Sequence, residues 1–149
     1  MKKIIAMLVA AAAFMSCTAD DTTTTTVALT GTWKLTSIVV PSAWDLNNDG
    51  NYTYDLVAES GCLDNSSLFF DADGFATVRI QSLELEENNE GSQTTYHVAC
   101  TGPEAETSAY TVWGSEVTFM IEGNPATFTM LGNTLATSQG GSTLTFTKI

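Results

Sequence analysis

The chain has 149 residues and a formal net charge of −12 at pH 7, because 17 acidic residues face 5 basic ones. A field of that sign repels nucleic acid and anionic lipid surfaces, so nucleic-acid binding is excluded as a function. Apolar residues make up 44% of the chain, but the first sixteen residues contribute heavily to that share. The remainder has the size of one small domain with a real core.

Residues 1–16 have the pattern of a lipoprotein signal peptide. The positively charged start MKK is followed by an apolar run over residues 4–15. That run is too short for a transmembrane helix, which needs about 20 residues. Such a segment is removed on export and takes no part in the fold. Without it, Lys34, Arg79 and Lys148 face all the acidic residues.

Cys17 follows the apolar run directly, in the stretch FMSCTADD. Ser16-Cys17 resembles the lipobox of bacterial lipoproteins, in which the cysteine is acylated and becomes the first mature residue. The resemblance implies lipid, such as palmitate, on Cys17 and attachment to the outer membrane of the cell envelope. Several acyl chains hold a protein durably to a membrane. The alternative is a secreted protein that is cleaved among the alanines.

Residues 17–28 are expected to form the lipidated cysteine and a disordered tether. Within residues 18–26, Asp20, Asp21 and five consecutive threonines occur without a large apolar side chain. Such a segment cannot bury enough surface to offset its chain entropy. Acidic residues just after the cysteine also resemble the surface-export signal of Bacteroidota lipoproteins, which implies a surface-exposed protein. Asp21-Thr22-Thr23 resembles the O-glycosylation acceptor of the same phylum.

Residues 29–149 have the pattern of an antiparallel all-β domain. TWKLTSIVV places Trp33 and Leu35 on one face, and SSLFFDADGFATVRI predicts two strands joined by a turn at residues 71–74. The later runs TTYHVAC, SAYTVW, EVTFMIE, ATFTML, NTLATS and STLTFTKI are rich in Thr, Val and Phe. About eight to nine strands with short connections predict a sandwich or barrel with up-and-down topology. A short helix is expected only within residues 52–60.

Cys62 and Cys100 form an even pair in a chain expected to be exported, which predicts a disulfide. Closing a loop of this length stabilises a fold by about 4 kcal/mol in the chain-entropy model. A metal site is the alternative. It would have His97 as its remaining soft ligand, and it lacks the CxxC spacing of zinc sites.

The start of the domain resembles a known family. In LTGTWKLTS, Gly31-Thr32-Trp33 is similar to the Gly-x-Trp signature on the first strand of the lipocalins. With the acidic Asn-rich loop, the motif FFDADG after Cys62 and the Gly-Asn turns, residues 29–149 resemble the lipocalin-like domains of Bacteroidota lipoproteins. The resemblance implies an antiparallel up-and-down β-barrel, with Trp33 packed across its floor.

The three tryptophans are candidate barrel or ligand residues. Trp33 is expected to be a core residue, because so large an aromatic side chain buries well at a barrel end. Trp113 ends a strand and is expected in the core or at the rim, with ligand contact as the alternative. Trp44 lies in a loop after Pro41, where it caps the barrel or contacts a partner.

The loop DLNNDGNYTYD has the spacing of a calcium-binding loop, with oxygen side chains at alternate positions and Gly50 at the sharp turn. The ligands from this loop would be Asp45, Asn47 and Asp49. The twelfth position is Leu56 rather than the expected bidentate carboxylate, and Asp55 or Glu59 would have to substitute for it. The alternative is an Asn/Gly-rich turn without a metal.

No pattern of residues predicts catalysis, so we expect a protein that is not an enzyme. His97 stands alone in a strand pattern, no Gly-x-Ser-x-Gly motif occurs, and residues 84–90 form a charge run typical of a solvated hairpin. We expect a non-catalytic module that binds a small or apolar ligand in or at its barrel. The alternative is an interaction subunit of an envelope complex with a solid core, which uses surface loops such as residues 41–59.

Overall fold

A computed structural model describes residues 28–91 and 93–149. The predicted signal peptide (1–16), the lipidation site Cys17 and the predicted tether up to residue 27 lie outside the described residues. The described part is nearly all β and contains one short helix. Its elements are β1 (Gly31–Trp44), β2 (Thr53–Asp55), α1 (Leu56–Ser60), β3 (Ser67–Phe70), β4 (Phe75–Ile80), β5 (Leu83–Glu90), β6 (Gln93–Cys100), β7 (Glu104–Ala109), β8 (Thr111–Trp113), β9 (Glu116–Ile121), β10 (Asn124–Leu131), β11 (Thr134–Gln139) and β12 (Ser142–Lys148).

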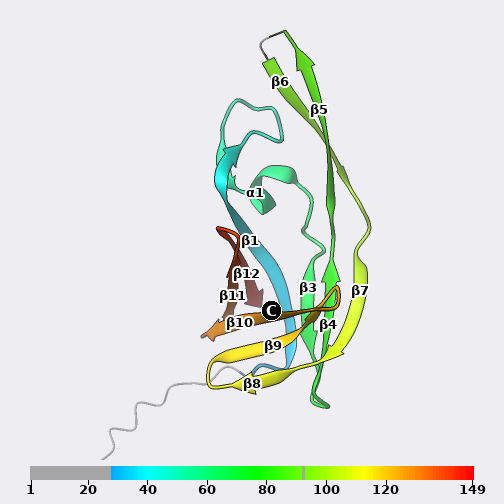
Figure 1. The fold of residues 1–149 in the computed structure, drawn as a ribbon, viewed down its shortest axis with the longest axis vertical. Coiled ribbons are helices and arrows are strands. Elements are labelled where there is room, and N and C mark those ends of the chain that lie inside the picture. Colours follow the sequence, from blue (N-terminus) through cyan, green and yellow to red (C-terminus); the bar gives the residue numbers. More distant parts are fainter. Residues whose placement is uncertain (1–27, 92) are drawn as a thin grey trace, which may run out of the picture.

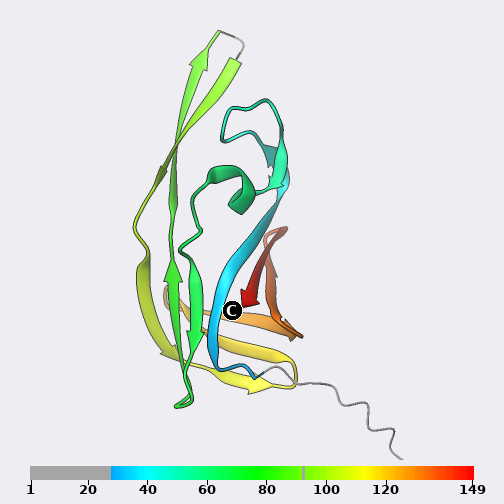
Figure 2. The same cartoon turned by 180° about the vertical axis from the view of Figure 1, so that it is seen from behind.

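Nine of these strands form one antiparallel, barrel-shaped sheet in the order β7-β4-β3-β1-β12-β11-β10-β9-β8 (Figures 1 and 2). Neighbours in this sheet follow one another along the chain, except that β2 lies between β1 and β3 and the β5–β6 hairpin between β4 and β7. The last strand, β12, pairs with the first, β1, from Trp33 opposite Lys148 to Val39 opposite Thr143. The predicted up-and-down barrel is therefore confirmed. β2 adds a short pairing to the far end of β1.

The barrel is nearly closed between β7 and β9, where side chains replace a backbone ladder. β7 pairs with β4, β8 pairs with β9, and Tyr110 alone separates β7 from β8. Ser108 Oγ accepts a hydrogen bond from Met120 N (3.0 Å) and donates one to Met120 O (3.3 Å). Glu106 Oε2 accepts from Glu122 N (2.6 Å). These bonds satisfy backbone groups that an open sheet edge would leave unpaired.

An aromatic core fills the end of the barrel where β1 begins. The rings of Phe119 and Phe128 stack with centroids 5.2 Å apart, and Phe70 and Phe146 meet them edge-on at 5.5 and 5.8 Å. Burying each such ring stabilises the fold by ~1.5–3 kcal/mol. Trp33 is fully buried beside this cluster. This end of the barrel is a packed core rather than a channel.

The β5–β6 hairpin is a separate two-stranded sheet that projects beyond the barrel (Figure 1). The run TTYHVAC, expected as one strand of the barrel, is β6 and pairs only with β5. The predicted disulfide is confirmed: Cys62 and Cys100 are bonded, with their Cα atoms 5.4 Å apart. It ties the end of β6 to the segment that follows α1.

Two local predictions are also confirmed. Residues 71–74 join β3 to β4, and Gly74 has a φ of 94°, which glycine adopts without strain. The short helix α1 lies within residues 52–60, where Asp55 caps it by accepting a hydrogen bond from Val57 N (3.0 Å). Gly61, in the left-handed conformation, ends it.

Candidate ligand and metal sites at the barrel mouth

The barrel opens at the end opposite the aromatic core. Directly paired residues of an antiparallel sheet share a face, so Ala126 and Leu144 point inward with their partners Phe119 and Thr137. Ala126, Thr137 and Leu144 are smaller than the aromatic rings that fill the other end of the barrel. β10 pairs with β11 only over Thr129–Leu131, and the two strands diverge beyond it. The result is a cavity of about 580 Å³ with mixed polar and apolar lining above Phe128.

A second cavity of about 310 Å³ lies between the end of β1, the loop after it, α1 and the start of β5. It is lined by Val40, Pro41, Ser42, Trp44, Leu46, Leu56, Leu83 and Leu85. None of these side chains is charged. Ligand sites have volumes of roughly 300–1,000 Å³ and mostly apolar walls. This apolar mouth cavity therefore has the chemistry of a site for a small apolar molecule.

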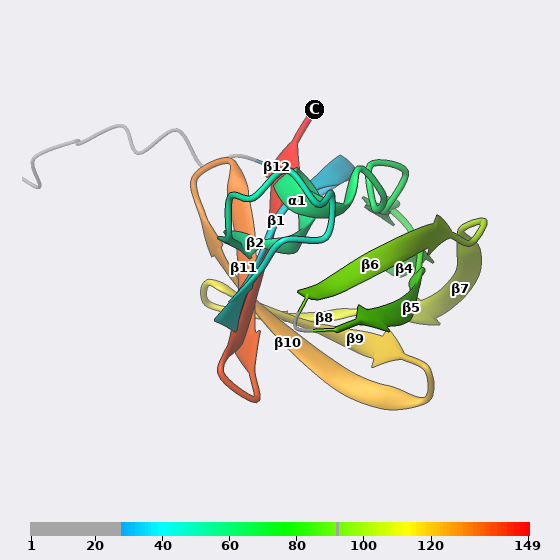
Figure 3. The same ribbon diagram turned by 90° about the horizontal axis from the view of Figure 1, so that it is seen from above.

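Trp44 holds the wall of the apolar mouth cavity against the hairpin. Its ring meets that of Tyr96 on β6 edge-on, with centroids 5.5 Å apart. In the following loop, Asn48 Nδ2 donates to Tyr96 O (2.8 Å), and Asn48 Oδ1 accepts from Tyr96 N (3.0 Å). Figure 1 shows the hairpin, this loop and α1 at one end of the molecule, and Figure 3 looks onto that end from above. Side chains from three separate segments thus build one site.

The calcium-like loop folds as a compact turn around Asp45. Asp45 Oδ1 accepts from Asp49 N (2.9 Å), and Asp45 Oδ2 accepts from Gly50 N (3.0 Å). Asn47 Oδ1 also accepts from Asp49 N, at 2.9 Å. The hydrogen bond from the backbone of Asn51, with a further one from the Asn47 side chain, holds the pKa of Asp49 below its usual value. Asp49 therefore remains an anion across the physiological pH range.

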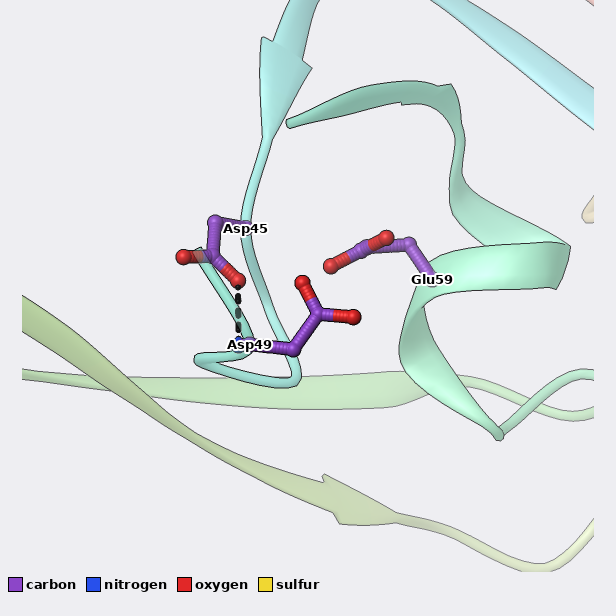
Figure 4. Close-up of side chains that lie close together, drawn as sticks. All are labelled: Asp45, Asp49 and Glu59. Atoms are coloured by element: carbon purple, nitrogen blue, oxygen red, sulfur yellow. Dashed lines mark hydrogen bonds between the residues drawn. The ribbon is translucent and has the colours of Figure 1, made fainter. Parts of the chain in front are cut away.

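Glu59 of α1 completes a group of three carboxylates with Asp45 and Asp49 (Figure 4). One oxygen of each lies within 4.8 Å of the others. Among the residues that the structure describes, no other group of three or more His, Cys, Asp or Glu side chains converges in this way. Glu59 is only 4% exposed, and its Oε1 accepts from Leu46 N (3.0 Å) and Asn47 N (3.4 Å).

The structure distinguishes between the two substitutes considered for the twelfth position of the loop. Asp55 is engaged elsewhere, because its Oδ1 accepts from Ile38 N (3.1 Å) and from Val57 N. Leu56 itself lines the apolar mouth cavity. Glu59, one helical turn beyond Asp55, faces the loop. Carboxylate oxygens in such a group are ligands suited to a hard cation such as Ca²⁺.

The remaining predicted site residues lie apart from the mouth. Trp33 is buried in the core, and its indole Nε1 donates to Leu29 O (2.8 Å). Trp113 is on the outer surface of β8 and is 83% exposed. His97 lies on the exposed hairpin opposite Glu86.

Sequence reasoning missed the leucines of the apolar mouth cavity. Leu83 and Leu85 alternate with glutamates in LELE. This period of two indicates a strand with one apolar face, and it was the signal that could have identified both leucines. Leu46 lies within the acidic loop and Leu56 directly follows it, so no hydrophobic periodicity identified either leucine as a cavity residue.

No protein-family model, curated protein or solved structure matches this chain. Within residues 28–91 and 93–149, no helix is long and apolar enough to cross a membrane.

Proposed function

We propose that this protein is a non-catalytic, lipocalin-like lipoprotein of the cell envelope that binds a small, neutral, apolar ligand at its barrel mouth. The observation that carries this proposal is the apolar mouth cavity of about 310 Å³. The up-and-down barrel and the burial of Trp33 beneath it support the lipocalin-like assignment. The lipobox-like Ser16-Cys17 supports anchoring through lipid on Cys17.

The lining of the apolar mouth cavity restricts the class of ligand. No lysine or arginine lines it to pair with an anionic head group, and the chain carries a net charge of −12. A charged ligand without a partner would have a high desolvation cost in such a site. Ser42 offers one hydroxyl that could fix a single polar group. A neutral alcohol, ester or hydrocarbon chain fits this chemistry best.

Quenching of Trp44 fluorescence by a medium-chain alcohol with a terminal bromine tests the proposal. The full chain carrying Trp113→Phe retains Trp44 in the cavity wall and Trp33 in the core. We expect saturable quenching that disappears in the Trp44→Phe variant. Leu85→Gln should weaken the binding, whereas Phe69→Gln, at a similarly exposed site on the outer face of β3, should not. Quenching that rises linearly and equally in all variants would contradict the proposal.

The lipid anchor has its own test. Radiolabelled palmitate should enter the expressed protein, and the Cys17→Ala variant should lose the label. Equal labelling of both proteins would rule out Cys17 as the acylated residue.

The alternative function, an interaction subunit of an envelope complex, gains support from the packed lower barrel, but the apolar mouth cavity favours ligand binding.

We propose calcium binding by Asp45, Asp49 and Glu59 as a second function of the same end of the molecule. Glu59 carries this proposal, because buried carboxylates are normally paired with a cation or a metal ion. Its oxygen lies near those of two further carboxylates, and a divalent cation would offset their repulsion. The ion would fix α1 relative to the loop, and so would stiffen one wall of the apolar mouth cavity.

A further inference from the structure

Three large apolar side chains are exposed at the end of the barrel opposite the mouth. Trp113 is 83% exposed, Leu131 79% and Ile149 77%, the highest values among the large apolar side chains that the structure describes. We call these three residues the lower rim. Single exposed apolar residues are ordinary, but a group of them marks a surface that contacts an apolar partner.

Backbone hydrogen bonds place Trp113 and Leu131 on neighbouring turns. Ser115, two residues after Trp113, accepts from the N–H of Met130 (2.7 Å). Trp113 ends β8, and Leu131 ends β10, with β9 paired between these strands. Both side chains therefore belong to the loops of one barrel end.

Ile149 lies at the same end, beside the point where the chain enters the barrel. Its N–H donates to Thr32 O (3.1 Å), and Lys148 N donates to Asn133 O (2.9 Å), two residues after Leu131. Lys148 Nζ donates to Thr30 O (2.8 Å) and to Ala28 O. The lower rim thus lies at the barrel end where the described chain begins, at Ala28.

The densest run of acidic side chains lies away from this rim, whereas Glu116, paired with Trp113, and the β3–β4 turn residues Asp71 and Asp73 lie at the rim end. Glu84, Glu86, Glu87 and Glu90 are exposed on the hairpin, beyond the far end of β1. β1 has 14 residues, which corresponds to roughly 45 Å of extended chain between the two ends. Figure 1 shows the hairpin and the strand β8 at opposite ends of the molecule.

We infer that the lower rim rests in the interfacial layer of the bilayer that holds the lipid on Cys17, an inference that relies on the proposed lipidation. Ten residues lie between Cys17 and Ala28, and the eleven Cα–Cα steps from one to the other reach about 38 Å at most when extended. The barrel end nearest to the anchor is the end that exposes Trp113, and tryptophan is enriched at membrane interfaces. Contact of the rim with lipid directs the mouth and the acidic hairpin away from the membrane.

Depth-dependent quenching tests this orientation. The full-length acylated protein, carrying Trp44→Phe, is reconstituted in phosphatidylcholine vesicles whose acyl chains bear bromine near the head groups. Zwitterionic lipid is used because the acidic chain repels anionic surfaces. We expect the emission of Trp113 to be largely lost, while the buried Trp33 continues to emit. A Leu131→Gln substitution should reduce that loss.

A reporter at the other end provides the matched control. Tyr52 is 70% exposed in the loop before β2, so Tyr52→Trp in a Trp44→Phe, Trp113→Phe background places an indole at another exposed site, far from the rim. Its emission should persist in the same vesicles. Protein that floats with the vesicles while Trp113 is unquenched would overturn the orientation alone. Protein that fails to float would overturn both the anchor and the orientation.

Discussion

The side-chain amide of Asn48 pairs with the backbone of Tyr96 through two hydrogen bonds of 2.8 and 3.0 Å. This arrangement imitates one rung of a β-ladder between a loop and the projecting hairpin. Asn48 has a φ of 57°, a left-handed conformation that asparagine tolerates better than most residues. The contact fixes the hairpin over the loop, and Trp44 packs against the same tyrosine.

We expect Asn48→Ala to release the hairpin from the loop. Loss of both hydrogen bonds should lower the free energy of unfolding by about 1 kcal/mol, because each contributes only modestly in net terms. Hydrogen exchange should accelerate at the amide of Tyr96, measured by mass spectrometry of peptides from β6. Asn89→Ala is the control, since the side-chain bonds of Asn89 remain within the hairpin. Equal exchange in both variants would show that the Asn48 contact does not hold the hairpin.

The disulfide should hold the base of the same hairpin. Cys62 and Cys100 are 38 positions apart, so the chain-entropy model gives about 4 kcal/mol of stabilisation. Urea denaturation should show a loss of this size for the Cys62→Ala, Cys100→Ala variant and for reduced wild type. Non-reducing peptide mapping should recover the two cysteines as one linked peptide. Two free thiols in protein taken from the envelope would refute the bridge.

Asp55 should give the fold a specific sensitivity to acid. Burial raises the pKa of Asp55, but hydrogen bonds from the Ser37 side chain and from the backbone of Ile38, Val57 and Ala58 outweigh it, so the pKa lies below its ordinary value of 3.8. The resulting stabilisation is present above pH 3.8 and is lost as the pH falls through the lower, folded-state pKa.

Two substitutions separate this charge effect from helix capping. Asn caps helices nearly as well as Asp, so Asp55→Asn should be less stable than wild type at pH 7 and should approach it in strong acid. Asp55→Ala also removes the cap and should cost about 1 kcal/mol more at every pH. Thermal melting from pH 2 to 7 measures both. A constant difference between wild type and Asp55→Asn would contradict the lowered pKa.

The barrel could be predicted from sequence because its determinants are local. Period-two strands, short Gly-containing turns and the turn at residues 71–74 specify a meander without knowledge of distant contacts. The disulfide followed from the even cysteine pair. The placement of β6 did not follow, because TTYHVAC alternates in the same way whether its neighbour is a barrel strand or a hairpin partner.

The mouth depended on contacts that local patterns do not encode. Glu59 was one of two carboxylates that could substitute for position twelve of the calcium-like loop. The position of α1 decides between the two carboxylates. Asp55 caps the helix, and Glu59, one helical turn later, faces the loop. Leu83 and Leu85 were hidden in a run dominated by glutamates, although their spacing placed them on one face of β5.

Calcium should stabilise the fold if Asp45, Asp49 and Glu59 bind it together. Dissociation constants of extracellular calcium modules are of order 10⁻⁴–10⁻³ M, and this loop lacks the usual bidentate ligand at position twelve, so millimolar calcium is needed. A hundredfold excess over the dissociation constant would add ~2.7 kcal/mol to the free energy of unfolding. Magnesium at the same concentration should have a smaller effect, because it demands near-ideal octahedral geometry.

Substitutions at exposed carboxylates locate the calcium effect without disturbing the buried Glu59. Asp49→Ala should abolish the calcium-dependent rise in melting temperature, because it removes one of the three converging carboxylates. Asp73→Ala, in the exposed β3–β4 turn, is the matched control and should retain the full rise. Isothermal titration of wild type should then show a binding isotherm that Asp49→Ala lacks. If millimolar calcium leaves the melting curve of wild type unmoved, residues 45–51 act only as the turn that presents Asn48 to the hairpin.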